Sequence, residues 1–485
     1  MEAERESQTT EWLNRTPAWL RRAAPVALPL AAGLALRLWM IRPIFNVDGD
    51  SLVYGGIARN LILHGRYALT ISGGELHSTL IRLPGYPLFL ALCFKLFGME
   101  NYFAAVPLQI ALDLLGCALM AGFVRRIVPE RASRGAALAT LWLAALCPFT
   151  AAYAVMPLAE TLSVFMLELG LWAMARFRDD PRWGNALWFT FALTAATLLR
   201  PDGALAAIAF APALFAGLGR DRRGSRVSLR KLVRMAAVCV LLALAPFAVW
   251  TARNWRVFHV VQPLAPRMAN DPGESTSPGW ERWVKSWCLD FISTYQIYWN
   301  VPGEKLDVSE LPSRAFDSPA QYAETASLAE QYNQQGMDLT LKIDAGFGRI
   351  AAERIAARPL RFYLWLPLGR VADMWLRPRV ENLPIDLDWW VYAHHWQDTL
   401  FGWTYAGLNA LYLLLAMAGL CSRPRFWGVL AAYMLLRSAL LWTVAAPETR
   451  YTIECFPMLF ALGGIALSRY GWRYRAGPHE MARLV

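Results

Sequence analysis

Long apolar segments recur along most of the chain, and they limit its fold more than any other feature. A helix needs about 20 apolar residues to cross the hydrocarbon core of a bilayer. Hydrophobic residues make up 56% of the 485 residues and charged residues only 18%, a balance that excludes an ordinary soluble protein of this length. The sequence therefore predicts an all-α polytopic membrane protein, with candidate spans near residues 24–41, 102–124, 135–153, 158–175, 184–199, 203–219, 235–252, 403–420, 426–446 and 452–469.

Lys and Arg residues gather in alternate connections between these segments. Such clusters are typical of the cytoplasmic side of a membrane, and the largest of them, at 220–234, follows the sixth segment. If all ten segments cross the membrane, every cluster of Lys and Arg lies on the same side of it. We expect both ends of the chain on that side as well. The net charge of +11 fits loops that face anionic lipid, and we expect a lipid bilayer and no nucleic acid as partner.

The connections on the other side are longer and less basic. A polar block at 266–345, rich in Asp, Glu, Gln, Ser and Pro, predicts a small helical insert on the outer face. The apolar segment after it contains Arg361 and Arg370, which favours helices that lie in the membrane–water interface. Alternatively, the segment could cross the membrane twice, which would leave the orientation of the later spans unchanged. The expected parts are a cytoplasmic segment 1–23, a transmembrane module 24–265 with a first external loop 42–101, the insert 266–345, interfacial helices 346–402, and C-terminal helices with a cytoplasmic tail 403–485.

The outer face collects acids and arginines at the ends of the predicted spans. Each alone could simply face lipid headgroups, but ionisable groups beside a cavity between spans are functional candidates. The guanidinium group of arginine can donate two parallel hydrogen bonds to the oxygens of a phosphate. A carboxylate can take a proton from a hydroxyl group. Together these residue types favour transfer of a group from a phosphate leaving group. The residues are Asp48, Asp50, Arg82, Glu160, Arg200, Asp202, Arg253, Arg256, Glu448 and Arg450.

Several stretches resemble recurrent elements of the GT-C glycosyltransferases. They are "GDSLVYGGIARNLILHGRYAL" in the first external loop, "RLPGYPLFLALCFKLFG" at 82–98, "PLAETL" at 157–162, "LLRPDG", "ARNWRVFH" and "PETRYTIECFPMLFALGG" at 447–464. In the first of these, Asp50, Tyr54, Ile57, Ala58, Asn60, Leu61 and Gly65 match the pattern. The ordered matches are similar to the protein O-mannosyltransferase and aminoarabinose transferase group, that is, glycosyltransferase family 39. They are specific for the superfamily and not for a substrate.

The resemblance implies a GT-C bundle of about 10 to 12 transmembrane helices and a reaction at its outer face. A sugar would pass, with inversion, from a polyprenyl phosphate to a hydroxyl of a glycan, lipid or protein acceptor, at the periplasmic side of a bacterial inner membrane. Asp50 would act as the general base, supported by Asp48, and Glu160 would orient the acceptor or a metal. Arg82, Arg200 and Arg450 would bind the donor phosphate, and Tyr54, Tyr451, Asp202 and Glu448 would support them.

Simpler roles stay open for these residues. Asp50 could cap the helix that "DSLVY" opens, and Glu160 could be an acid favoured at a helix start. The arginines could pair with headgroups or with nearby acids such as Asp202 and Glu448. The tyrosines could serve packing alone.

The first loop departs from many relatives in one position. Ser51 stands where they have Glu, so the chain resembles a single-Asp branch often described as lipopolysaccharide-core-transferase-like. Relatives that bind a divalent metal in this region use acids that have no clear match here, so we predict no metal-ligating residues. His64 and His77 lack metal-ligand spacing, and we expect no ligand role for His394 and His395 either.

Two other functions compete with transfer from a polyprenyl phosphate. A transporter or flippase for an anionic lipid-linked glycan would also need arginines, but it is expected to place charges near the middle of its spans. An oligosaccharide ligase with a diphosphate-linked donor would need much the same residues.

Overall fold

The computed structural model describes residues 18–71, 73–215, 228–266, 268–391 and 395–475. Several features discussed above lie outside this part of the chain: residues 1–17 of the predicted cytoplasmic segment, residues 220–227 of the basic cluster, His394, and residues 476–485.

Helices dominate the described residues, as expected for an all-α membrane protein. Every one of the ten predicted spans falls on a helix or on the bent pair α6–α7. The helices are α2 (Ala18–Ile44), α5 (Ala105–Ile127), α6 (Glu130–Ala145), α7 (Pro148–Ala154), α8 (Glu160–Asp179), α9 (Trp183–Leu199), α10 (Ala204–Phe215), α11 (Leu229–Phe258), α17 (Trp396–Cys421), α18 (Trp427–Leu441) and α19 (Phe456–Arg475).

Length and hydropathy separate these helices into two groups. Within the described residues, five helical segments are long and apolar enough to cross a membrane, or six if α6 and α7, which meet at a bend of 55°, form one span. Others, such as Trp427–Leu441, are apolar but shorter. The total of 10 to 12 spans therefore stays a prediction.

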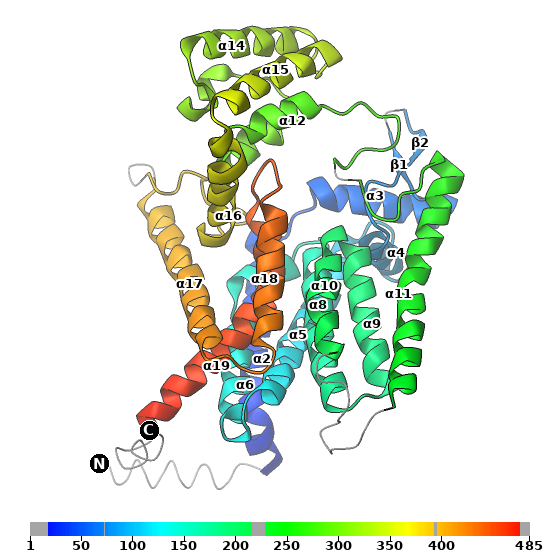
Figure 1. The fold of residues 1–485 in the computed structure, drawn as a ribbon, viewed down its shortest axis with the longest axis vertical. Coiled ribbons are helices and arrows are strands. Elements are labelled where there is room, and N and C mark those ends of the chain that lie inside the picture. The colour runs from blue at the N-terminus through cyan, green and yellow to red at the C-terminus, as the bar shows by residue number, and fades with distance from the viewer. Residues whose placement is uncertain (1–17, 72, 216–227, 267, 392–394, 476–485) are drawn as a thin grey trace.

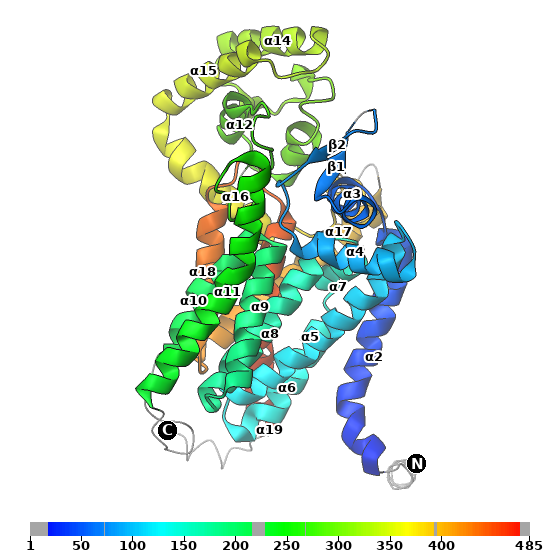
Figure 2. The same ribbon diagram turned by 90° about the vertical axis from the view of Figure 1, so that its right-hand side faces the viewer.

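The bundle has two clearly different ends. The start of α2, the end of α10, the start of α11 and the end of α19 lie at one end, whereas a helical module lies beyond the other (Figures 1 and 2). Inside the bundle, α8 packs against α5 and α9, and α19 packs against α6 and α17. This arrangement leaves the connections that carry the predicted site residues at the end beside the module.

The first external loop folds into two helices and a hairpin. Helices α3 (Gly49–His64) and α4 (Gly85–Phe97) lie across the end of the bundle (Figure 2), and β1 (Ala68–Thr70) pairs antiparallel with β2 (Leu76–Ser78). Helix α3 ends at Gly65, whose φ of 62° is left-handed and therefore suits glycine. The buried Asn60 amide donates to the Ala68 carbonyl at 2.9 Å. The matched residues of this loop thus shape the turn from α3 into the hairpin.

The helical module covers the predicted insert and part of the segment after it. It comprises α12 (Pro278–Lys285), α13 (Phe291–Ser293), α14 (Pro319–Gln334) and α15 (Leu341–Ala357), and α16 (Leu366–Leu376) leads back toward the bundle. Ser318 caps α14 by accepting from the Gln321 amide, with Pro319 in the first turn, where its missing N–H costs nothing. Trp280, Trp283 and Phe347 form its buried core.

Close approach of α17 to α19 depends on Gly419. A Cβ atom at this position would lie 2.0 Å from the Leu462 carbonyl oxygen, so that the two helices would have to move apart. We expect Gly419→Ala to lower the free energy of unfolding by about 1–3 kcal/mol, measured as a lower melting temperature in detergent. Gly407→Ala on the same helix is the control, because nothing lies within 4 Å of a Cβ there; equal losses in both variants would refute the packing argument.

Candidate functional site

Asp50 lies in the first turn of α3, between two arginines from distant parts of the chain. Its Oδ1 accepts a hydrogen bond from Arg82 Nη2 at 2.6 Å, and its Oδ2 accepts one from Arg450 Nη1 at 2.9 Å. The alternative that Asp50 caps the helix is wrong, because the N-cap residue is Asp48, whose side chain makes no capping hydrogen bond. The carboxylate therefore holds the first external loop to the turn before α19.

A second carboxylate, Glu160 at the start of α8, lies beside this pair. Its Oε1 accepts from Arg200 Nη1 at 2.9 Å and lies 4.0 Å from Arg450 Nη1. Arg200 also contacts Asp202 in the turn between α9 and α10. Arg450 therefore links the Asp50 pair to the Glu160 and Arg200 pair in one charged cluster.

Sequence analysis missed two members of this cluster. Arg437 on α18 lies 2.5 Å from Asp202 Oδ2 and 2.9 Å from Glu454 Oε2 through its Nη1. Glu454 also lies 3.1 Å from Arg200 Nε and accepts from Ser163 Oγ at 2.8 Å. Both sit inside apolar runs, and a charged residue within a predicted span is the signal that could have found them.

The predicted supporting residues take different positions around the cluster. The Tyr451 hydroxyl donates to Glu448 Oε1 at 2.5 Å, and Glu448 also contacts Arg450. The Tyr54 ring packs edge-on against Tyr86 at 5.0 Å, with the Arg82 guanidinium 5.9 Å away. Asp48 is exposed and accepts a hydrogen bond from Asn46 at 2.7 Å. The described contacts do not join Asp48 to the charged cluster.

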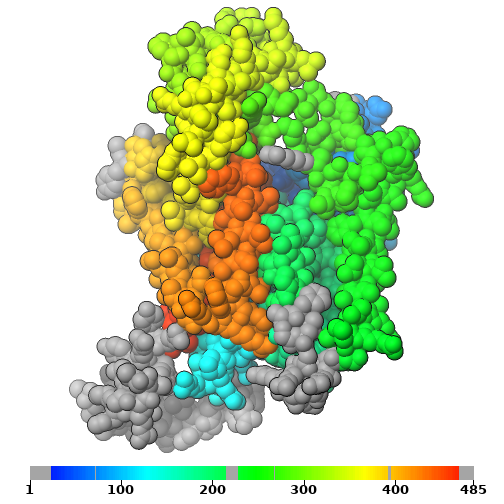
Figure 3. Space-filling view, in the orientation of Figure 1, coloured from blue at the N-terminus to red at the C-terminus, as the bar shows by residue number. Residues whose placement is uncertain are grey.

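Exposure divides the arginines into an outer and an inner pair. The side chains of Arg82 and Arg450 are each 25% exposed, whereas that of Arg200 is 16% exposed and that of Arg437 is fully buried. A ligand arriving from outside would meet the outer pair first. Figure 3 shows the surface hollowed beneath the helical module, with residues from the N-terminal part of the chain visible inside the hollow.

The charges around Asp50 fix its protonation. Burial raises the pKa of the Asp50 carboxyl, but Arg450 and Arg82 outweigh burial through their charges and hydrogen bonds and lower that pKa to about 2. Burial and the negative charges of Asp50 and Glu160 raise the pKa of Tyr54 to about 12. At neutral pH the site therefore presents an ionised carboxylate beside a neutral phenol.

Glu381 is a further buried acid that sequence analysis did not single out. It follows α16, and its Oε2 is buried without a hydrogen-bond partner among the described residues. Burial raises the pKa of Glu381 to about 7, although the charge of Arg379 opposes the rise. This residue therefore changes protonation near neutral pH, unlike Asp50.

One set of metal-ligand side chains meets in the described residues: His77, Asp271 and Glu274. It lies at the β1–β2 hairpin and not in the charged cluster. His395, in contrast, is exposed and lies 3.6 Å from Asp386.

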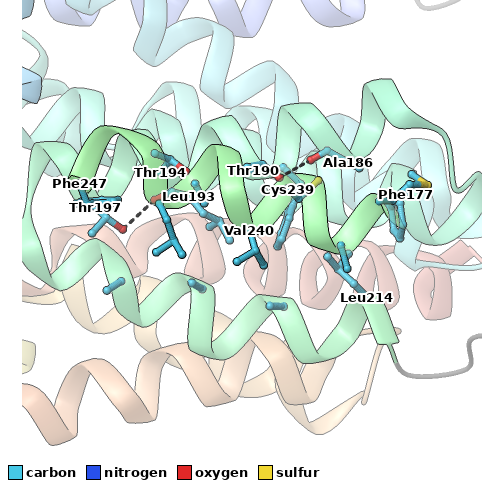
Figure 4. A pocket seen from close by; sticks show the side chains of 18 of the residues that line it. Phe177, Ala186, Thr190, Leu193, Thr194, Thr197, Leu214, Cys239, Val240 and Phe247 are labelled. Atoms are coloured by element: carbon cyan, nitrogen blue, oxygen red, sulfur yellow. Dashed lines mark hydrogen bonds between the residues drawn. The ribbon is translucent and has the colours of Figure 1, made fainter. Parts of the chain in front are cut away.

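An apolar cavity of about 380 Å³ lies between α8, α9, α10 and α11. Figure 4 shows its lining. Of its three threonines, Thr190 and Thr197 donate to the carbonyls of Ala186 and Leu193 on their own helix, whereas the Thr194 hydroxyl has no hydrogen-bond partner among the described residues; the other lining side chains are apolar or Cys239. The cavity therefore suits an apolar chain. Its lining extends to Thr197, about one helical turn before Arg200.

Comparison with known proteins relates the middle of the chain to one family. Residues 82–250 match the model of the dolichyl-phosphate-mannose-protein mannosyltransferases. No curated protein matches the chain.

Solved structures similar to this chain are distant in sequence. The oligosaccharyltransferase of Archaeoglobus fulgidus, tethered to an acceptor peptide, is 13% identical with a TM-score of 0.49 over 94% of this chain and 51% of its own. The same enzyme with an inhibitory peptide and a dolichol-phosphate has 13% identity and a TM-score of 0.47, over 94% and 52%. ArnT from Cupriavidus metallidurans, bound to undecaprenyl phosphate, is 15% identical with a TM-score of 0.37, over 93% and 78%.

The present chain spans about half the length of the archaeal enzyme. Residues 82–250 are therefore similar to the dolichyl-phosphate-mannose-protein mannosyltransferases, and the described part of the chain is mainly helical, with five or six helices long and apolar enough to cross a membrane.

Proposed function

We propose that the protein transfers a sugar from a polyprenyl phosphate to a hydroxyl acceptor at the outer face of a bacterial cytoplasmic membrane. The observation that carries this proposal is the ionised Asp50 carboxylate held between Arg82 and Arg450. A general base and phosphate-binding cations are the two parts that displacement at a phosphate-linked sugar carbon needs.

In the proposed reaction the acceptor hydroxyl oxygen attacks the anomeric carbon from the face opposite the phosphate. The new carbon–oxygen bond forms as the bond to the phosphate oxygen breaks, and Asp50 takes the hydroxyl proton. The lipid phosphate leaves with the bonding electrons, and its growing negative charge is stabilised by an arginine. A single displacement inverts the configuration at the sugar carbon.

Donor binding would also change the basicity of Asp50. In the structure Arg82 and Arg450 both face the Asp50 carboxylate and lower its pKa to about 2. At that pKa the carboxylate is a weak base. A phosphate that draws Arg82 or Arg450 away removes part of that stabilisation, so the pKa of Asp50 rises when the donor is in place. The base would then become effective only beside a bound donor.

A lipid-linked donor also needs an apolar site for its tail. We assign this role to the cavity between α8, α9, α10 and α11 (Figure 4), because it is apolar and its lining reaches to within about one helical turn of Arg200. The phosphate would then lie at the charged cluster while the chain stays in the membrane.

The direct test uses purified full-length protein in detergent with a panel of polyprenyl-phosphate and polyprenyl-diphosphate sugars. We expect release of lipid phosphate that depends on a hydroxyl acceptor. Release of lipid diphosphate would favour the oligosaccharide ligase, and no turnover with any donor, together with transport of a lipid-linked glycan in vesicles, would favour the transporter.

The pH profile tests the pairing of Asp50 with Arg82. Since the wild-type pKa is about 2, protonation of Asp50 should not limit kcat/KM between about pH 4 and 8. Arg82→Met removes one charge and one hydrogen bond that lower the pKa while burial still raises it, so an acid limb should move up into the measurable range. Profiles of identical shape would contradict the assignment of Asp50 as the base.

A further inference from the structure

Three metal-ligand side chains meet where the β1–β2 hairpin touches the connection from α11 to α12. His77 lies on β2, and Asp271 and Glu274 lie in the connection; their ligand atoms are all within 4.8 Å of one another. The His77 Nε2 atom lies 4.0 Å from both Asp271 Oδ2 and Glu274 Oε1. Sequence analysis predicted no such set, because the ligands come from distant parts of the chain.

Backbone hydrogen bonds aim both carboxylates at the imidazole. Asp271 is 2% exposed, and its Oδ1 accepts from the Leu80 amide at 2.7 Å. Glu274 Oε2 accepts from the Asp271 amide at 2.7 Å. In each acid, one carboxylate oxygen therefore accepts a hydrogen bond from a backbone amide, and the other oxygen faces His77. Fixed outer partners of this kind orient ligands in metal sites.

We propose that His77, Asp271 and Glu274 bind one divalent transition-metal ion, with Zn²⁺ preferred. Imidazole nitrogen and carboxylate oxygen both bind Zn²⁺ at about 2.0–2.2 Å, so two such ligands on one ion lie roughly 3.3–4 Å apart. The two His77–carboxylate separations of 4.0 Å would have to close by up to about 0.7 Å, and the two carboxylate oxygens lie within 4.8 Å of each other. A neutral imidazole with two carboxylates balances the charge of the ion, whereas Mg²⁺ and Ca²⁺ favour sites made of oxygen alone.

The site would hold the hairpin in place and through it one residue of the charged cluster. Leu80, bonded to Asp271, is two residues from Arg82, and the Arg82 carbonyl accepts from the Tyr67 hydroxyl at 3.0 Å. An ion at His77 therefore joins the connection to α12 with the segment that carries Arg82 to Asp50. Its role is structural, at a distance from the proposed reaction.

The test is zinc binding by the full-length protein, purified in detergent without a polyhistidine tag and stripped with a chelator. Calorimetric titration and metal analysis should give one Zn²⁺ per chain, and Zn²⁺ should raise the melting temperature. Co²⁺ in place of Zn²⁺ should give visible absorption bands. His77→Ala and Glu274→Gln should each weaken binding at least ~10-fold. Asp271 is left unchanged because it also holds the Leu80 amide.

His64→Ala is the matched control, since this exposed histidine ends α3 in the same external loop. It should bind Zn²⁺ as the wild type does. Absence of stoichiometric binding in the wild type, or unchanged binding in both ligand variants, overturns the proposal. None of these readouts uses turnover, so the site and the proposed reaction can fail separately.

Discussion

Asp50→Asn should lower kcat about 10³-fold, because an amide keeps the shape of the carboxylate but cannot accept the acceptor's proton. The fold should persist, since the side chain is 22% exposed and lies at the mouth of the bundle. The measurement is release of lipid phosphate at saturating donor and acceptor, beside a melting curve. A loss in kcat with a nearly unchanged melting temperature is the expected result.

Asp48→Asn provides the control for this substitution. Asp48 lies two residues away and is exposed, but it contacts Asn46 instead of the cluster arginines. It should retain activity within a few-fold of the wild type. If Asp50→Asn turned over at the wild-type rate, Asp50 could not be the base, and if Asp48→Asn were equally inactive, the choice between the two acids would be wrong.

Arg37→Met should destabilise the protein more than any other single change considered, by about 3–5 kcal/mol. Arg37 on α2 is fully buried, and its Nε donates to Asp113 Oδ2 on α5 at 2.5 Å. Its Nη1 donates to the carbonyls of Gly33 and Ala145 at 2.9 and 2.6 Å. Removal of the arginine leaves the Asp113 carboxylate buried without its partner. The measurement is the melting temperature in detergent.

The double substitution Arg37→Met with Asp113→Leu separates loss of the pair from loss of packing. Replacing both partners by apolar residues removes the uncompensated charge, so the double variant should melt above Arg37→Met alone. If the double variant melted below the single one, the ion pair would not explain the effect.

Hydropathy was enough to locate the helices of the ten predicted spans, because a helix that crosses a bilayer must be long and apolar, but it did not predict α3 and α4 in the first external loop. The prediction that acids and arginines at segment ends would converge needed only the alternation of sides, and Asp50, Arg82, Glu160, Arg200 and Arg450 do meet. Asp48 shows the limit of that argument. It carries the same charge two residues earlier, but the direction of its side chain depends on where α3 begins.

Other contacts depend on how the helices pack, which no local pattern records. Arg437 and Glu454 lie in apolar runs, and the packing of α18 against α10 and of the turn before α19 against α8 brings them to Asp202 and Arg200. His77 has no metal ligand near it in sequence, because Asp271 and Glu274 approach it only after α11 returns the chain to the hairpin. Spacing rules find ligands within one element and fail for such assemblies.

The ion pair between Asp50 and Arg450 can form only after both residues have been synthesised. The two partners are 400 positions apart in the sequence, so the residues between them must be synthesised before Asp50 can meet its second arginine. Before Arg450 has been synthesised, Arg82 is the ion-pair partner that the described residues provide for Asp50. A chain that has not yet been synthesised as far as Arg450 therefore lacks the contact that joins the first external loop to the turn before α19.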